Sequence, residues 1–122
     1  MKILQIFAFT LAASLVVPVS VPAEWIHGTV YGVGQTSCGR FIAAREEKDE
    51  TALAVFTAWM EGFMTALTLF DERRHPGDFA GGKDELSLLL WLENYCRANP
   101  LNDYFQAVTS LTNELIQSTK DK

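Results

Sequence analysis

The side chains in this sequence that could do chemistry are few, and the two cysteines come first. Cys38 and Cys96 can form a disulfide, supply a nucleophilic thiolate, or bind zinc together with His27 and His75. Zinc sites usually show ligand spacings such as CxxC or HxxxH, and the sequence contains neither. We therefore expect a disulfide and rank the catalytic thiol and the zinc site below it.

Glu61 and His75 are the remaining candidates for acid–base catalysis. Neither belongs to a GxSxG, HExxH or SxxK motif, and Glu61 falls in a polar stripe where a solvated carboxylate is the commoner finding. The glycines at 32 and 34 do not begin a nucleotide-binding GxGxxG loop, because Ser37 stands in the third position. We expect no catalysis, metal or cofactor, and keep a small hydrolase using Glu61 or His75 as a distant alternative.

Residues 1–23 have the composition of a signal peptide. Lys2 supplies a positive start, residues 3–17 are apolar, and small residues precede the expected cleavage after Ala23. Cleavage would leave 122 − 23 = 99 residues, enough for one domain, and would change the net charge from −5 to −6 by removing one lysine. So acidic a chain argues against nucleic acid as a partner. We expect a periplasmic or secreted protein, in which two cysteines normally pair.

Residues 51–70 form the longest amphipathic pattern, and we expect the domain to pack around this helix. The pattern predicts one wide apolar face made of Ala52, Val55, Phe56, Trp59, Phe63, Ala66, Leu67 and Phe70. Gly62 is expected to let another backbone approach beside Trp59. The segment is long enough to cross a membrane, but Glu61 and four threonines favour a side that faces water. A spanning helix would also separate the two cysteines.

Three further helices complete a predicted all-α, four-helix domain over residues 37–122. The first follows Ser37, whose hydroxyl is expected to cap it, and ends in the charged run 45–50, which we interpret as a solvated turn. The third covers residues 84–98, after a loop at 71–83. The fourth begins near Pro100 and has an apolar side formed by Leu101, Tyr104, Phe105, Val108, Leu111, Leu115 and Ile116. Residues 24–36 are predicted to be an extended arm or a short strand.

The predicted helices contain two sets of residues with expected roles, one in the core and one in partner contact. Residues expected to anchor the core are Trp59, Gly62, Phe63, Leu92 and Pro100. Leu86 and Leu90 fall outside the apolar face of the third helix, beside Glu93, and therefore suggest a contact surface. The full set of candidate partner contacts is Leu86, Leu90, Glu93, Arg73, Arg74 and Phe79.

The order of these motifs resembles a known group of small exported helical proteins. Cys38, then the run WMEGF at 59–63, then the run YCRANP at 95–100 and a last amphipathic helix are similar to the HdeA acid-stress chaperones and the Rap/Tai immunity proteins of type VI secretion. The likeness covers residues 37–116. The positions that match are Cys38, Trp59, Gly62, Cys96 and Pro100, and the resemblance implies structural roles for them. It also implies an all-helical fold with a disulfide joining two helices, and a role in binding protein.

The two branches of this group imply different mechanisms. An immunity protein would block a delivered toxin in the periplasm through an exposed surface, either alone or as a homodimer. An acid chaperone, or holdase, would lose carboxylate charge at low pH, loosen and bind unfolding clients, and the fifteen acidic residues of this chain could serve such a switch. The chain lacks lysine-rich ends, however, having only Lys120 and Lys122 at its tail. We therefore expect a toxin inhibitor, with the holdase as the alternative.

Overall fold

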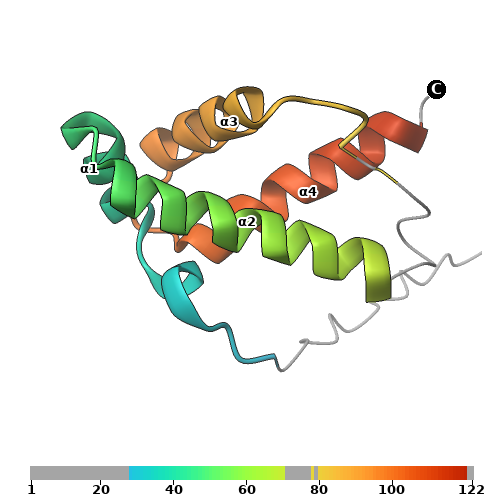
Figure 1. Cartoon of the computed structure of the whole chain (residues 1–122), viewed down its shortest axis with the longest axis horizontal. Helices are drawn as coiled ribbons and strands as arrows, with labels where there is room; N and C mark the ends of the chain where they lie inside the picture. Colours follow the sequence, from blue (N-terminus) through green and yellow to red (C-terminus); the bar gives the residue numbers. More distant parts are fainter. Residues whose placement is uncertain (1–27, 71–77, 79, 121–122) are drawn as a thin grey trace, which may run out of the picture.

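The computed structural model describes residues 28–70, 78 and 80–120, and within these ranges it is all-helical (Figure 1). A short 3-10 helix, η1 (Gly32–Gln35), precedes four α-helices: α1 (Cys38–Glu47), α2 (Glu50–Phe70), α3 (Glu85–Ala98) and α4 (Tyr104–Lys120). The predicted four-helix fold is therefore confirmed. The only β-type pairing among the described residues is an isolated bridge between Ser37 and Asp103. The predicted signal peptide lies outside the described residues.

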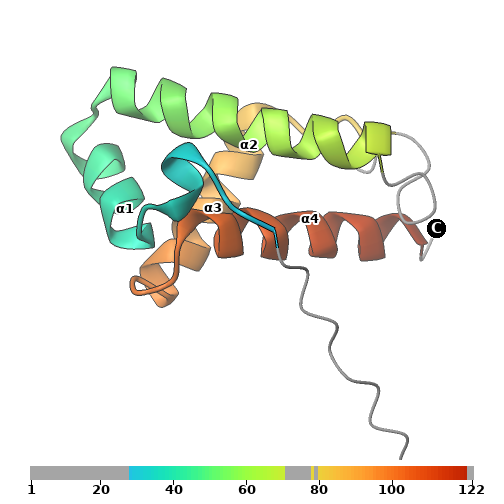
Figure 2. The ribbon, with the colours of Figure 1, turned by 90° about the horizontal axis from the view of Figure 1, so that it is seen from below.

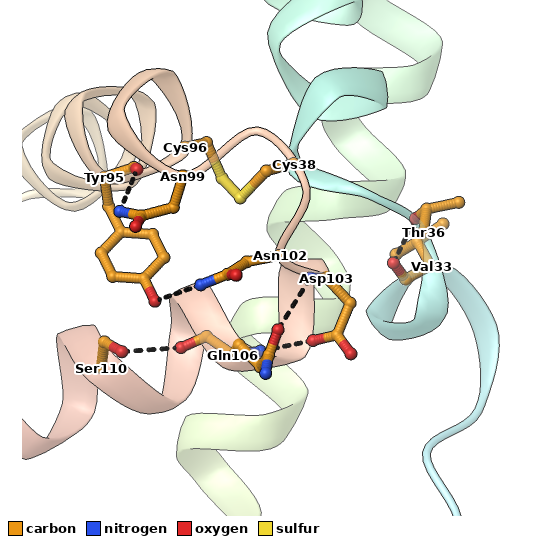
Figure 3. The surroundings of a disulfide bond; sticks show 10 residues. All are labelled: Val33, Thr36, Cys38, Tyr95, Cys96, Asn99, Asn102, Asp103, Gln106 and Ser110. Carbon is orange, nitrogen blue, oxygen red and sulfur yellow. Dashed lines mark hydrogen bonds between the residues drawn. A yellow bond between two sulfur atoms is a disulfide. The ribbon is translucent and has the colours of Figure 1, made fainter.

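The predicted disulfide is present and joins Cys38 to Cys96 (Figure 3). Cys38 at the start of α1 and Cys96 near the end of α3 are fully buried, and their Cα atoms are 4.8 Å apart, within the usual range for a disulfide. The bond joins residues 58 positions apart in the sequence. It therefore fixes α3 against α1, the pair of helices that pack most closely.

The free backbone amides at the start of α1 find hydrogen-bond partners other than the one predicted. Ser37 does occupy the N-cap position, but its hydroxyl makes no capping hydrogen bond. Instead the free backbone amides of Cys38 and Gly39 donate to the carbonyls of Asn102 and Pro100, at 2.7 and 3.2 Å. The turn before α4 thus caps α1, which explains why a local hydroxyl is not needed.

The helix α4 begins four residues after Pro100, so the predicted start was wrong. Asp103 caps it: the Asp103 carboxylate accepts from the Gln106 amide at 2.7 Å, and the Gln106 side chain accepts from the Asp103 amide at 3.0 Å (Figure 3). Pro100 and Leu101 form a turn instead, and Leu101 is 95% exposed rather than on the apolar side. This reciprocal capping box outweighs the preference of proline for a first helical turn.

The helix α2 buries a narrower face than the sequence predicts. Phe56 and Met60 are buried, and six residues pack partly buried against the core: Ala52, Leu53, Trp59, Phe63, Met64 and Leu67. Val55, Ala66 and Phe70 are exposed, so their predicted place in the apolar face was wrong. Phe70 is exposed because the end of α2 continues well past α1 and η1, the elements against which the helix packs most (Figures 1 and 2).

Large aromatic side chains fill the space between the helices. Phe41 of α1, Phe56 of α2 and Tyr104 of α4 meet with ring centroids 4.7–5.2 Å apart. The buried Tyr104 hydroxyl donates to the Phe56 carbonyl at 3.3 Å, and burial raises the pKa of Tyr104. Leu92, predicted as a core residue, is fully buried in α3. These contacts hold four elements around one core.

The N-terminal arm packs on α2 and α4 through η1 (Figure 2). Trp59 donates its indole N–H to the Tyr31 carbonyl at 2.8 Å and stacks on Phe63 at 5.6 Å. The close backbone approach to Trp59 is made by Gly34, where an added Cβ would lie 2.8 Å from Trp59 Cε2. The prediction that gave this role to Gly62 was wrong, because nothing lies within 4 Å of a Cβ at Gly62.

Candidate functional site

The exposed leucines of α3 stand on a firmly held first turn. Asp84 caps α3 by accepting from the Ser87 amide at 2.9 Å and from the Ser87 hydroxyl at 2.8 Å, and these hydrogen bonds lower the pKa of Asp84. Leu86 and Leu90 follow one helical turn apart and are 59% and 47% exposed. We call these two leucines the α3 patch. The opposite face of the helix is anchored by Leu88, Leu89 and Leu92.

Glu93 connects the α3 patch to α1 through two arginines. One oxygen of its carboxylate accepts from Arg45 at 2.9 Å, and the other accepts from Arg97 at 2.9 and 3.2 Å. Arg97 also pairs with Glu46 of α1 at 2.9 Å. Hydrogen bonds from Arg97 and then Arg45 lower the pKa of Glu93. Both oxygens of Glu93 are therefore engaged within the fold, so its main effect is to hold α3 in place.

This ion-pair network was not foreseen from the sequence. The run 45–50 was interpreted as a solvated turn, yet Arg45 and Glu46 both reach α3. Glu93 and Arg97 are four residues apart on one helix, a spacing that favours an ion pair and could have been recognised. Their partners in α1 lie about 50 residues away, and a sequence pattern does not reveal such a pairing.

Two aromatic residues attach α3 to α4 and its preceding turn. Trp91 stacks on Tyr95 with ring centroids 5.5 Å apart and donates its indole N–H to Glu114 of α4 at 3.0 Å. The Tyr95 hydroxyl accepts from the Asn102 side chain at 2.9 Å (Figure 3). Trp91 thus supports the fold by joining α3 to α4.

The other candidate contacts lie outside the described residues. Arg73, Arg74 and Phe79 belong to that group, as do His27 and His75. The described end of the loop is a compact turn, in which the Asp78 carboxylate accepts from the amides of Gly81 and Gly82 at 3.1 and 3.2 Å. Among the described residues, no cluster of three or more His, Cys, Asp or Glu side chains could hold a metal ion.

A second exposed surface lies on α2 and was not predicted. The α2 outer face consists of Thr51, Ala54, Val55, Ala58, Gly62, Thr65, Ala66 and Leu69, all exposed. Beside it an apolar hollow of about 450 Å³ opens between the arm, α2 and Phe105 of α4, with Trp59, Gly62 and Phe63 in its lining. A shallower hollow of about 560 Å³ lies along residues 50–58, and the two hollows share Ala58.

By length and composition alone, α2 could cross a membrane. Its most apolar 18-residue window has a mean hydropathy of 1.5, and only 11% of that window is buried within the fold. The core residues Phe56 and Met60 nevertheless tie this helix to α1 and α4. The helix therefore combines one buried side with an unusually apolar exposed side.

Comparison with protein-family models, with curated proteins and with solved structures found no match to this chain.

Proposed function

We propose that this chain is an exported, non-catalytic inhibitor that binds a toxin protein through the α3 patch. The observation that carries the proposal is the combination of two exposed leucines with a rigid support. Leu86 and Leu90 project from a helix that is capped at Asp84, ion-paired to α1 through Glu93 and linked to α1 by the disulfide. Preorganised apolar anchors lose little entropy on binding, and exposed apolar side chains that lie together mark protein-interaction sites.

The charge of the chain suggests the kind of toxin surface that would fit. Asp84 and Glu85 flank the α3 patch, and the mature chain has a net charge of −6 after loss of Lys2 from the full-length −5. A partner with an apolar pocket and a basic rim would gain both contact area and electrostatic steering. The resemblance to the Rap/Tai immunity proteins supports the same reading, with the periplasm as the expected compartment.

The experiment is a pull-down with the mature, oxidised protein at neutral pH. Periplasmic extract and the secretions of competitor cells are the two sources of partners. We expect one dominant partner, which Leu90→Asp abolishes. Leu101→Asp is the matched control, because Leu101 is 95% exposed on the turn before α4, away from the patch. Retention of the partner by Leu90→Asp, or its equal loss in both variants, would contradict the proposal.

The acid-activated holdase remains the alternative, and the Glu93 network favours it to a limited degree. Protonation of Glu93 would break the ion pairs that join α3 to α1. The lowered pKa of Glu93 places this loss at a pH below the ordinary glutamate range. A holdase would bind a hydrophobic dye and suppress client aggregation only in acid, whereas a toxin inhibitor needs neither behaviour.

A further inference from the structure

We propose that the α2 outer face joins two copies of this chain in an antiparallel, two-fold contact centred on Ala58. This surface is separate from the α3 patch, so the inference goes beyond the proposed inhibitor function and does not depend on it. The α2 outer face leaves apolar side chains exposed. Only 11% of the residues in the most apolar 18-residue window of α2 are fully buried, and Val55 and Leu69 are 50% and 63% exposed, although contiguous apolar surface is normally covered in a water-facing domain.

Small side chains are regularly spaced along the α2 outer face. Ala54, Ala58 and Gly62 are exposed and follow one another at intervals of four residues, so they form one row on the helix. A two-fold axis at Ala58 places Ala58 opposite itself and Ala54 opposite Gly62 of the second copy. The row is therefore complementary to itself, as an isologous interface requires. Side chains this small also let two helix backbones approach closely.

The Val55 side chain of one copy matches the apolar hollow of the other. Val55 is 50% exposed and lies three residues before Ala58. The same two-fold axis brings it level with Glu61 and Gly62 of the second copy, on the flank that carries the 450 Å³ hollow over Trp59 and Gly62. Val55 of each copy can therefore enter the hollow of the other. Nothing lies within 4 Å of a Cβ at Gly62, so this space is free to be filled.

Charge decides between the antiparallel and parallel arrangements. The charged residues of α2 are Glu50 and Glu61, and the helix contains no basic residue. A parallel pair would set each glutamate beside its own copy. In the antiparallel pair the two Glu61 residues are six helical positions apart, about 9 Å along the axis, and the two Glu50 residues are about 24 Å apart. Glu50 of one copy lies five positions, about 7.5 Å along the axis, from Glu61 of the other. With a Debye length of about 8–10 Å these separations leave less repulsion than the parallel pair, in which both pairs of glutamates lie at the same level.

The expected strength of the contact follows from its size. A single helix face with its flanking arm is smaller than the roughly 800 Å² per partner of a standard interface. The dimer should therefore be reversible and depend on protein concentration. Each mature copy carries the same net charge of −6, so higher ionic strength should strengthen the association, whereas a contact held by opposite charges would weaken.

The test is analytical ultracentrifugation of the mature, oxidised protein over a range of concentrations, combined with cysteine cross-linking. We expect a monomer–dimer equilibrium that Val55→Asp abolishes and Leu101→Asp leaves unchanged, both variants keeping the wild-type circular dichroism spectrum. Ala58→Cys should cross-link into dimers on mild oxidation, because the two-fold axis brings the new thiols within disulfide reach. Leu86→Cys, on the α3 patch, is the matched control and should not.

Three results would each overturn the inference. The first is a monomer at every concentration, and the second is cross-linking of Leu86→Cys equal to that of Ala58→Cys. The third is flotation of the wild-type protein with phosphatidylcholine vesicles, abolished by Val55→Asp, which would assign the α2 outer face to lipid instead of to a second copy.

Discussion

Two glycines near Trp59 give a paired substitution with opposite expected signs. Gly34 lies against the indole ring, and a Cβ added there would overlap Trp59 Cζ2 and approach Cε2 and Val30 Cγ1 at 2.8 and 2.7 Å. Gly62, in the middle of α2, has open space around it. Gly34→Ala should therefore disturb the packing of the arm, and Gly62→Ala should only improve the helix.

The two substitutions should change the free energy of unfolding by different amounts and in opposite directions. Relief of the overlap at Gly34 must move the arm or Trp59, and overpacking of this kind costs about 1–3 kcal/mol. Because 1 kcal/mol corresponds to roughly 4–8 °C in a domain of this size, a cost near 2 kcal/mol lowers Tm by roughly 8–16 °C. Gly62→Ala should raise the free energy of unfolding by about 1 kcal/mol, the difference in helix propensity, and raise Tm by roughly 4–8 °C.

The assay is thermal unfolding followed by far-UV circular dichroism and by tryptophan fluorescence. Measurements at the lowest workable protein concentration keep self-association from contributing to Tm. A matched pair of this kind controls for the general effect of replacing glycine by alanine. The reasoning is refuted if both variants shift Tm in the same direction, or if Gly34→Ala melts at the wild-type temperature.

Two further perturbations address the links between α1 and α3. Cys96→Ser should lower the free energy of unfolding by about 4 kcal/mol, because the disulfide closes a loop spanning 58 positions, and a wild-type Tm under oxidising conditions would contradict this. Glu93→Gln tests the ion pairs by urea unfolding at several pH values. The folded-state pKa of Glu93 is lowered, so its stabilisation is present at neutral pH and is lost as the pH falls through that pKa. The stability difference between wild type and Glu93→Gln should therefore shrink in acid; a difference that stays constant would show that Glu93 does not titrate in this network.

The features predicted correctly from the sequence are those that depend on local periodicity or composition. The four helices follow from apolar spacing, and the pairing of Cys38 with Cys96 follows from a composition of two cysteines in a chain expected to be exported. The exposure of Leu86 and Leu90 was predicted in the same way, since both fall outside the apolar face of α3.

The features that were missed depend on which distant segment lies nearby. The apolar pattern of α2 does not show how far its neighbours extend, so Phe70 was expected to be buried and is 86% exposed. A glycine three residues after Trp59 suggested a close approach at Gly62, while the arm supplies that approach from Gly34. Likewise the carbonyls of the turn before α4, rather than Ser37, satisfy the first amides of α1.

The position of the disulfide makes the two halves of this chain a covalent pair. Lys83 is exposed in the turn before α3, and cleavage after it by trypsin would separate α1 and α2 from α3 and α4. The Cys38–Cys96 bond and the contact of Phe56 with Tyr104 both cross that cut. A nicked molecule would therefore stay one covalent molecule, heavier by a single water, and would keep its core until a reductant is added. The same property makes the chain a candidate for fragment complementation, in which the two pieces are made separately and joined by oxidation.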